Sequence, residues 1–477
     1  MDLHVSLEGR GDLTARIYRQ LLDAIVDGRL RAGERLPPSR ELAHRLDVAR
    51  NTVAVAYERL VAEGFLTARV GDGTYVSDEA RVATQTRRAP KGTDVRPRPV
   101  WSTFSADPTK RDLAYNFNVG VPDAGMFPLE TWRRLIVRNL RLATIGSGQY
   151  RDPAGLQRLR DAIARYAGVA RSVRAGSDDV VVTHGAQQAI DLVGRVFVEP
   201  GALVAVEEPG YPPARQVFHT LGARVVGVPV DREGLDIAAI PGGVRLVYTT
   251  PSHQFPTGVP MSLARRTALL TWARDNGALI IEDDYDSEFR YSTRPLEPLQ
   301  SLDRDGRVIY VGTFSKTLLP VLRMGYLVAP ASLHSALLYA KRIADRHSEI
   351  FTQAALADFM DEGLLARHVR KATRVYAERH ELVVDTLQRE FDAWLEVVPA
   401  SAGLHVCTRR RPGVEIDIEA VIHHAAASDV AVESLAGYCG EPVAQDGLVI
   451  GYGGIATERI EPGFALLRKT FEACASR

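Results

Sequence analysis

The sequence predicts an α/β protein in two parts, a small helical head with a β-hairpin and a much larger domain in which buried strands alternate with helices. Three observations support this prediction. The 477 residues exceed what one small core holds, because domains usually contain about 100–200 residues. Apolar residues recur at helical spacing near the N-terminus, whereas short runs rich in Val and Ile recur beyond residue 180. Between the two patterns, residues 78–111 lose apolar periodicity.

Composition excludes several classes of protein. Apolar residues make up 45% and charged residues 25%, which is ordinary for a globular protein and argues against general disorder. Lys and Arg together number 59, as do Asp and Glu, so a uniformly basic surface is excluded but a local basic patch is not. The three cysteines are widely separated and odd in number, which favours a reducing compartment and predicts neither a disulfide framework nor a metal site.

The sequence contains no recognisable signal peptide or membrane-spanning run. Charged side chains interrupt the first ten residues, and no later apolar run approaches the roughly 20 residues that cross a bilayer. We therefore expect a cytoplasmic protein with no membrane partner.

Residues 1–77 have the pattern of a winged helix-turn-helix. Three segments show helical spacing of apolar residues: one beginning at Leu13, a short one at Leu42–Leu46, and one at Arg50–Glu63. Two β-prone triplets then flank Gly71–Gly73, where glycines supply the positive φ of a hairpin turn. This hairpin is the expected wing.

The head carries polar residues where a helix-turn-helix contacts DNA. Such a motif lays its recognition helix in the major groove, where the first residues of that helix reach phosphates and base edges. Arg50, Asn51 and Thr52 begin that helix, and Arg40 and Gly71 can reach flanking phosphates or the minor groove. A lone arginine is more often a solvated surface charge, but the grouping around one tight turn favours contact. The predicted partner is double-stranded DNA, and the expected location is the nucleoid.

Residues 78–111 are predicted to be a basic flexible linker. Arg, Pro, Thr and Ser dominate this segment. Its basic residues include Arg87, Arg88, Lys91, Arg96 and Arg98.

Residues 112–477 form the predicted large domain. Seven apolar runs are predicted strands: Val180–Thr183, Leu203–Val206, Arg224–Val230, Leu246–Thr249, Leu279–Ile281, Val308–Val311 and Tyr326–Ala329. Strands that are apolar on both faces and separated by helices indicate a mainly parallel sheet. From Phe351 onward, long amphipathic stretches and a final helix after Glu458 indicate a smaller C-terminal α+β subdomain.

The strongest chemical signal is Lys316, which directly follows a predicted buried strand. A lysine in such a place loses solvent, and desolvation lowers its pKa as Schiff-base formation requires. Thr313, Ser315 and Arg323 add two hydroxyls and a guanidinium, a set that suits a phosphate dianion.

Two further segments indicate ligand binding. Val181–Ile190 is a strand that enters a helix through glycine, so it offers backbone N–H groups to an anion. Glu282–Phe289 places carboxylates after a strand, at the sheet edge where α/β proteins bind ligands. One carboxylate there can keep a pyridinium nitrogen protonated. Each signal is weak alone, because glycine turns and surface carboxylates are common without ligands.

The head resembles the GntR family of bacterial regulators. The resemblance rests on four segments: Leu36–Ala43, Arg50–Tyr57, Leu60–Gly64 and Gly71–Thr74. It implies that five residues contact DNA: Arg40, Arg50, Asn51, Thr52 and Gly71. Ala49 replaces a residue that is commonly polar in the family, which removes one hydroxyl contact.

The large domain, from about Phe117 to the C-terminus, resembles fold-type-I pyridoxal-phosphate enzymes, specifically the aminotransferase-like domain of MocR-type GntR regulators. Besides the three segments described above, the matching motifs are Tyr150–Leu156, Glu208–Tyr211 and Thr250–Gly258. The resemblance implies a PLP-dependent-transferase fold, pyridoxal 5′-phosphate as cofactor, and a homodimer.

The resemblance also assigns roles to individual residues. Lys316 is the implied catalytic residue and forms the Schiff base, while Asp283 pairs with the pyridine nitrogen. Tyr285 hydrogen-bonds the phenolic oxygen, and Tyr211 stacks on the ring unless it is simply a core aromatic. The implied phosphate ligands are Ala186, Gln187, Thr313, Ser315 and Arg323. Tyr150 is expected to reach the site from the other subunit of the dimer.

The sequence departs from the aminotransferase pattern at two places. Gly447–Tyr452, where an arginine for the substrate carboxylate is usual, offers Leu448 instead. Phe255 stands where many such enzymes have asparagine, although phenylalanine is familiar there in the regulators. Without a bidentate partner a buried carboxylate binds poorly, so tight binding of an ordinary α-amino acid is not expected.

Three functions remain open. The first is a regulator that senses pyridoxal phosphate itself, or an amine or amino-acid effector that reacts with it, and so alters promoter binding; vitamin B6 synthesis and amine catabolism are the targets that the resemblance implies. The second is a working aminotransferase with an appended DNA-binding head. The third keeps the head but makes the large domain a cofactor-free dimerisation scaffold.

Overall fold

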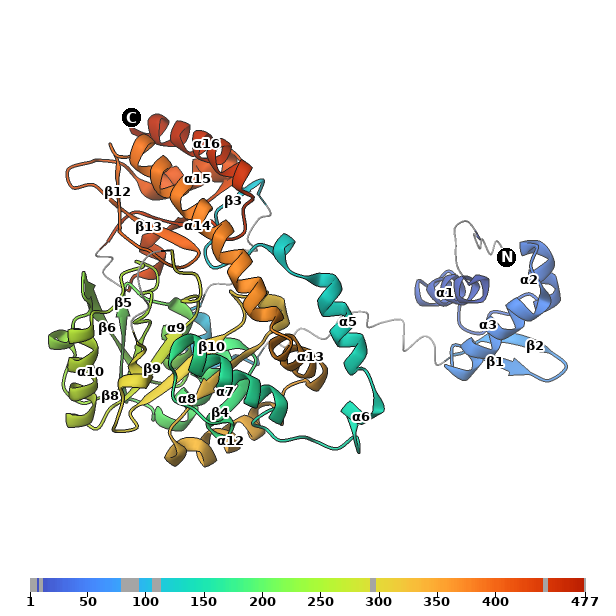
Figure 1. The fold of residues 1–477 in the computed structure, drawn as a ribbon. Helices are drawn as coiled ribbons and strands as arrows, with labels where there is room; N and C mark the ends of the chain where they lie inside the picture. Colours follow the sequence, from blue (N-terminus) through green and yellow to red (C-terminus); the bar gives the residue numbers. More distant parts are fainter. Residues whose placement is uncertain are drawn as a thin grey trace. The chain divides into compact units, whose positions relative to one another are not determined.

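The computed structural model describes residues 7, 12–78, 94–104, 113–291, 297–440 and 445–475. The chain divides into two compact units, Met1–Arg98 and Pro99–Arg477 (Figure 1). Much of the predicted linker, including Arg87, Arg88 and Lys91, lies outside the described residues. Within the described ranges, no helix is both long enough and apolar enough to cross a membrane.

The N-terminal unit is a winged helix-turn-helix, as predicted. Its elements are α1 (Leu13–Val26), α2 (Ser39–Leu46), α3 (Arg50–Ala62), β1 (Leu66–Arg69) and β2 (Gly73–Val76). The two strands pair antiparallel and close the wing. The helices share one core, in which Ile17, Val53 and Leu60 have no exposed surface. The third helix ends one residue earlier than predicted.

The larger unit is built on a mixed eight-stranded sheet with the order β4-β11-β10-β9-β8-β5-β6-β7. The strands are β4 (Val180–Thr183), β5 (Leu203–Glu208), β6 (Arg224–Asp231), β7 (Gly234–Leu235), β8 (Val244–Thr249), β9 (Leu279–Asp284), β10 (Val308–Thr313) and β11 (Gly325–Val328). All seven predicted strands are present, and the short β7 is additional.

The sheet is parallel from β10 to β6, as expected, but β11 runs antiparallel to both of its neighbours. The loop from β10 to β11 spans only residues 314–324. A parallel pair needs a crossover of about a dozen residues or more, so this loop favours an antiparallel return. The loop carries Lys316, which therefore leaves the sheet at the carboxyl end of β10.

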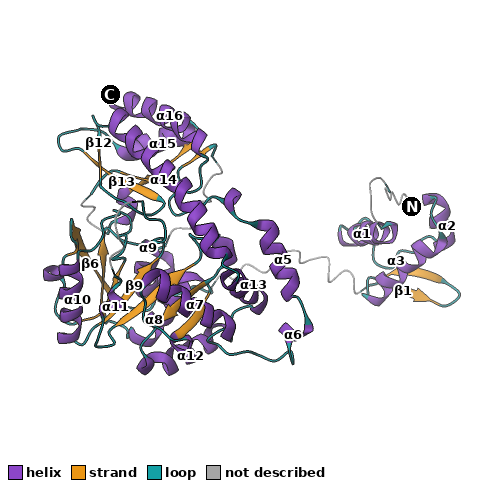
Figure 2. Ribbon diagram, viewed as in Figure 1, coloured by secondary structure: helices purple, strands orange, loops and turns teal. Residues whose placement is uncertain are grey.

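Helices cover both faces of this sheet (Figure 2). The covering helices are α7 (Gln157–Arg171), α8 (Gly185–Phe197), α9 (Pro212–Thr220), α10 (Leu263–Asp275), α11 (Leu299–Leu302), α12 (Ala331–Asp345) and α13 (Ile350–Asp361). Two further helices, α5 (Leu129–Asn139) and α6 (Leu142–Ile145), contact α13. Successive side chains of a strand point to opposite faces. Tyr248 accordingly packs with apolar residues of α8 and α9, whereas Val247 packs with those of α10. Both faces of the sheet are therefore buried.

The predicted smaller α+β subdomain follows. Its four-stranded sheet has the order β12 (Leu395–Val397), β13 (His405–Arg410), β16 (Leu448–Gly451) and β15 (Glu433–Ser434). Its helices are α14 (Leu364–Glu390), α15 (Ile418–Ala427) and α16 (Thr457–Ala475). The long α14 runs from α13 to α16 (Figure 1).

The subdomain also includes the start of the larger unit, which the sequence analysis did not predict. The short strand β3 (Tyr115–Asn116) pairs in parallel with β14 (Val430–Ala431). Phe117, which has no exposed surface, joins the same apolar core. Residues 118–120 therefore pass between the subdomain and the large sheet, where the main cavity lies.

Candidate functional site

The larger unit contains a cavity of about 1270 Å³ between the carboxyl ends of the sheet strands and the smaller subdomain. Nine of the ten residues predicted to bind a cofactor line it: Ala186, Gln187, Tyr211, Asp283, Tyr285, Thr313, Ser315, Lys316 and Arg323. The tenth, Tyr150, does not line this cavity. Its side chain is exposed and lies against the ring of His347 and the guanidinium of Arg346.

Lys316 projects into the cavity from the loop after β10. Its Nζ donates a hydrogen bond to the carbonyl oxygen of Gly120 at 2.6 Å. Gly120 has a φ of 74°, and a Cβ built on it would lie 2.6 Å from the same Nζ. The left-handed backbone favours glycine at this position, and a larger residue would also displace the end of the lysine side chain. The sequence analysis did not single out Gly120, because almost 200 residues separate it from Lys316.

Asp283 lies at the end of β9 and is 4% exposed. Tyr248, on the neighbouring strand β8, donates a hydrogen bond to its Oδ2 at 2.7 Å. Its Oδ1 is buried and has no hydrogen-bond partner among the described residues. Burial raises the pKa of Asp283 to about 7. A buried carboxylate that lines a cavity and has one oxygen without a hydrogen-bond partner is suited to a protonated nitrogen supplied by a ligand.

Aromatic rings form another wall of the cavity. Tyr211 meets the edge of Phe255 with ring centroids 5.5 Å apart, and Phe255 meets Tyr285 at 5.6 Å. Burial raises the pKa of Tyr211 to about 12, so its hydroxyl stays protonated near neutral pH. Aromatic side chains that line a cavity in this way suit a planar heteroaromatic ring.

The predicted anion ligands meet at the N-terminus of α8. Ala186 and Gln187 belong to the first turn of this 13-residue helix, whose N–H groups and dipole favour an anion. The guanidinium of Arg323 lies 3.2 Å from where a Cβ on Gly185 would stand, and it donates to the carbonyl oxygen of His184 at 2.8 Å. Thr313 donates from its hydroxyl to Ser315 Oγ at 3.0 Å, which completes a cradle of hydroxyls, guanidinium and helix terminus.

The far side of the cavity comes from the smaller subdomain. Glu419 and His423 of α15 and Glu433 of β15 line it. Among the described lining residues, Arg323 is the one arginine, and it belongs to the anion cradle. Leu448 is fully buried in the subdomain core and does not line the cavity.

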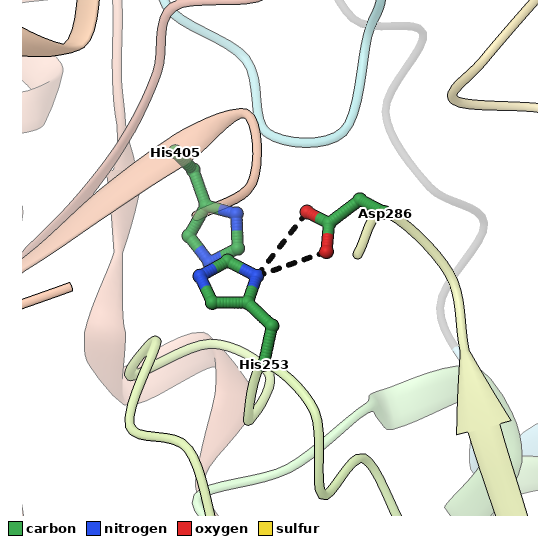
Figure 3. Close-up of side chains that lie close together, drawn as sticks. All are labelled: His253, Asp286 and His405. Carbon is green, nitrogen blue, oxygen red and sulfur yellow. Dashed lines mark hydrogen bonds and ion pairs between the residues drawn. The ribbon is translucent and has the colours of Figure 1, made fainter. Parts of the chain in front are cut away.

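A buried group of three side chains adjoins Tyr285: His253, Asp286 and His405 (Figure 3). The Tyr285 hydroxyl lies 2.9 Å from His253 Nδ1, and that nitrogen lies 3.0 Å from Asp286 Oδ1. The sequence analysis missed this group and also Tyr248. No spacing pattern could have revealed the group, because its members come from three separate segments.

In the head, the predicted DNA contacts lie on the surface. Arg40, Arg50, Asn51 and Gly71 are exposed, and Thr52 is half-buried. Gly71 has a φ of 76° in the wing turn, where no other residue type would be unstrained.

The start of α3 is positioned by the core of the head. The buried Tyr57 hydroxyl donates to the carbonyl oxygen of Pro37 at 2.9 Å, which ties α3 to the segment before α2. Ala49 is the N-cap residue of α3 and offers no capping side chain. The exposed first turn of α3 therefore presents side chains and N–H groups together.

Both units match known families. Residues 13–76 match the bacterial regulatory proteins of the gntR family, and residues 114–428 match the class I and II aminotransferases. The probable rhizopine catabolism regulatory protein MocR of Rhizobium meliloti is 36% identical over 97% of this chain and 94% of its own. The HTH-type pyridoxine biosynthesis transcriptional regulator PdxR of Corynebacterium glutamicum is 33% identical over 92% of each chain.

The larger unit also matches the solved structure of an aminotransferase. The kynurenine aminotransferase of Pyrococcus horikoshii, determined in complex with PMP, superposes with a TM-score of 0.70 at 27% identity. The match covers 76% of this chain and 92% of that one.

Proposed function

This chain belongs to the MocR-type GntR family, in which a gntR-family head precedes an aminotransferase-like domain, and we propose that it is a transcriptional regulator controlled through pyridoxal 5′-phosphate. The head binds double-stranded DNA, and the cavity binds the cofactor. One observation supports the second half of the proposal: Asp283, whose Oδ1 has no hydrogen-bond partner among the described residues, lines the same cavity as Lys316 and the anion cradle.

The residues of the cavity fit the parts of this cofactor. Lys316 would hold its aldehyde carbon covalently, and Asp283 its pyridinium nitrogen. Tyr211 would cover one face of the ring, and Tyr285 would donate to the phenolic oxygen. The phosphate would be held by Ala186, Gln187, Thr313, Ser315 and Arg323. When bound, the cofactor supplies an electrophilic carbon that reacts with primary amines.

We propose that the signal is the cofactor itself or an amine that reaches it through the subdomain side of the cavity. The relative from Corynebacterium glutamicum is named for pyridoxine biosynthesis, which supports the first choice. Glu419 and Glu433 on the subdomain side favour a cationic amine, which supports the second. The cavity volume of about 1270 Å³ leaves room for such an effector beside the cofactor.

A homodimer would place two heads on one DNA site. The segment of α5 and α6 exposes four apolar residues, Leu129 and Val137 in α5, Leu140 directly after it and Leu142 in α6, and Tyr150 follows them in the chain. Exposed apolar residues gathered in this way indicate an interface. We propose that Tyr150 completes the phosphate site of the other subunit, and that the paired heads bind two half-sites about one helical turn apart.

The decisive experiment adds pyridoxal phosphate to the purified full-length protein. A visible absorbance band should appear, and borohydride should fix a mass adduct onto Lys316. Lys316→Ala should lose both, while Lys371→Ala, at an exposed lysine of α14, should keep both. A wild-type protein that stays colourless and unmodified would refute the cofactor site and leave the scaffold function.

A second measurement tests regulation. Retention of the protein's own upstream DNA in a gel should change when pyridoxal phosphate is added to wild type, but not when it is added to Lys316→Ala. Identical retention in all four conditions would contradict control through the cofactor.

An aminotransferase with a DNA-binding head is the alternative, because Lys316, Asp283 and the anion cradle are the parts such an enzyme needs. Sustained conversion of an amino donor and a keto acid, lost in Lys316→Ala, would establish it. A single stoichiometric turnover would not.

A further inference from the structure

His253 and Asp286 form a buried pair that the cofactor assignment does not use. Their side chains are 2% exposed. His253 Nδ1 lies 3.0 Å from Asp286 Oδ1 and 3.2 Å from Oδ2 (Figure 3). The pair joins the loop after β8 to the residues after β9, and Tyr285 is the neighbour of Asp286 in the chain.

The position of the proton on this pair follows from the carboxylate. Among the described residues, His253 Nδ1 is the one hydrogen-bond donor to the Asp286 side chain, and a buried carboxylate without a donor is costly. Nδ1 must therefore carry a proton. His253 Nε2 is buried without a partner, which favours the neutral ring, since an N–H there would also be unpaired.

The proton on Nδ1 determines which way the Tyr285 hydroxyl points. The hydroxyl oxygen lies 2.9 Å from the same Nδ1. A protonated Nδ1 has no lone pair to accept with, so Tyr285 accepts from His253 and must donate its own proton elsewhere. Because Tyr285 lines the cavity, that proton is available to a ligand oxygen.

We propose that His253 and Asp286 are positioning residues that make Tyr285 a dedicated hydrogen-bond donor to an oxyanion in the cavity, the phenolic oxygen of the bound cofactor. The inference rests on the proposed function. It gives Tyr285 particular weight, because the neighbouring Phe255, which stands where many aminotransferases have asparagine, has no side-chain donor.

The ionisable groups around the pair indicate that His253, and not a neighbouring histidine, donates the hydrogen bond to Asp286. The ionisable side chains that interact with His253, Asp286 or Tyr285 are Glu207, Asp283, Asp284, Arg290, Tyr291, His380, His405 and Tyr452. Burial lowers the pKa of His405 to about 3, and burial also lowers that of His380, so both rings are neutral. His405 Nε2 is engaged with the carbonyl oxygen of Pro256 at 3.0 Å, which leaves it no proton for Asp286 from that nitrogen.

A metal ion is the competing explanation, because His253, Asp286 and His405 offer ligand atoms within 4.8 Å of one another. Ligands of a tetrahedral zinc ion stand about 3.4 Å apart at metal–ligand distances of about 2.1 Å. The shorter separation of 3.0 Å between His253 and Asp286 is that of an ordinary hydrogen bond, and so is the 2.9 Å contact with Tyr285. Hydrogen bonding therefore accounts for these contacts without an ion.

Asp286→Asn is the sharpest test, since it preserves shape but removes the negative charge that keeps the proton on His253 Nδ1, so that Nδ1 becomes an acceptor. Tyr285 would then give its proton to His253 and lose it for the ligand. Removing a donor from an oxyanion raises its basicity. The pH midpoint of the visible cofactor band should therefore rise by about one unit in Asp286→Asn and at least as much in Tyr285→Phe. The double variant should match Tyr285→Phe alone.

The controls separate this inference from the proposed function. Asp275→Asn, at an exposed position of α10, should leave the midpoint unchanged. If Asp286→Asn fails to fold, as judged by its unfolding temperature, His253→Gln gives the same comparison. If Asp286→Asn and His253→Gln kept the pH midpoint of the wild type while Tyr285→Phe shifted it, the inference would be overturned. Stoichiometric transition metal in the purified protein that is lost in His405→Gln would also overturn it. A wild-type protein with no visible band would refute the cofactor site instead.

Discussion

The two candidate sites of this protein are built in opposite ways. The predicted DNA contacts of the head come from residues 40–71, are mostly exposed, and belong to elements adjacent in sequence. The cavity of the larger unit gathers residues from Phe104 to Tyr438, and the carboxylate of Asp283 in it is almost fully buried. A surface site can lose one side chain without disturbing its neighbours, whereas a buried site couples each residue to partners that must remain satisfied. The effects of two substitutions on binding should therefore add in the head, whereas in the cavity the effect of one should depend on the other.

We expect Asp283→Asn to have the largest effect on binding of the variants that test this comparison. It removes the charge of the proposed partner of the cofactor nitrogen, whose carboxylate also accepts a hydrogen bond from Tyr248. Cofactor affinity, measured by titration of the visible band, should fall at least about 30-fold, or about 2 kcal/mol. Tyr248→Phe should cause a smaller loss, and its combination with Asp283→Asn should be less than additive. Strict additivity would contradict the coupled site.

Arg50→Ala should reduce affinity for promoter DNA by about tenfold, equivalent to about 1.4 kcal/mol. The salt dependence of binding should lose about one unit of slope if the arginine contacts phosphate. The cofactor band should be unchanged. Arg45→Ala, at an exposed residue of α2 paired with Glu41, is the matched control and should bind DNA almost normally. Equal effects of the two variants would refute the assigned recognition helix.

The two sites should also respond differently to pH. The pKa of Asp283 is raised by burial from 3.8 to about 7, so the carboxyl becomes protonated below that pH and cannot pair with a pyridinium nitrogen. Cofactor affinity should therefore fall by about tenfold as pH falls from about 8 to about 6, and much less in Asp283→Asn. DNA binding by the cofactor-free protein depends on guanidinium groups, which stay charged in this range, so it should stay level. A pH-independent cofactor affinity in wild type would exclude Asp283 as the partner.

The smallest expected effect is a gain of stability in the head. Ala49 caps α3 without a side-chain hydrogen bond and is exposed. Ala49→Ser should stabilise the head by about 1 kcal/mol, seen as a higher unfolding temperature of its transition in calorimetry. The transition of the larger unit should not move. A shift of both transitions would show that the head does not unfold on its own.

Much of the fold followed from local patterns. The seven predicted strands are present because apolar runs buried on both faces are recognisable one at a time, and Gly71–Gly73 marked the wing in the same way. The antiparallel β11 was missed, since strand direction depends on the length of the loop that contains Lys316. The contribution of Tyr115–Phe117 to the smaller subdomain was missed for a related reason: its partner strand lies more than 300 residues away.

The sequence by itself determined the chemistry available to this protein: a lysine after a buried strand, hydroxyls and a guanidinium beside it, and an arginine-led recognition helix. These features are local, because covalent connection and helix or strand periodicity place them. Only the tertiary structure decided three contacts. The Lys316 amine donates to the carbonyl oxygen of Gly120, and Tyr248 donates to just one oxygen of Asp283. The third contact joins His253, itself paired with Asp286, to Tyr285. Such partnerships depend on burial and on the approach of distant segments, and neither property is written in the spacing of residues along a chain.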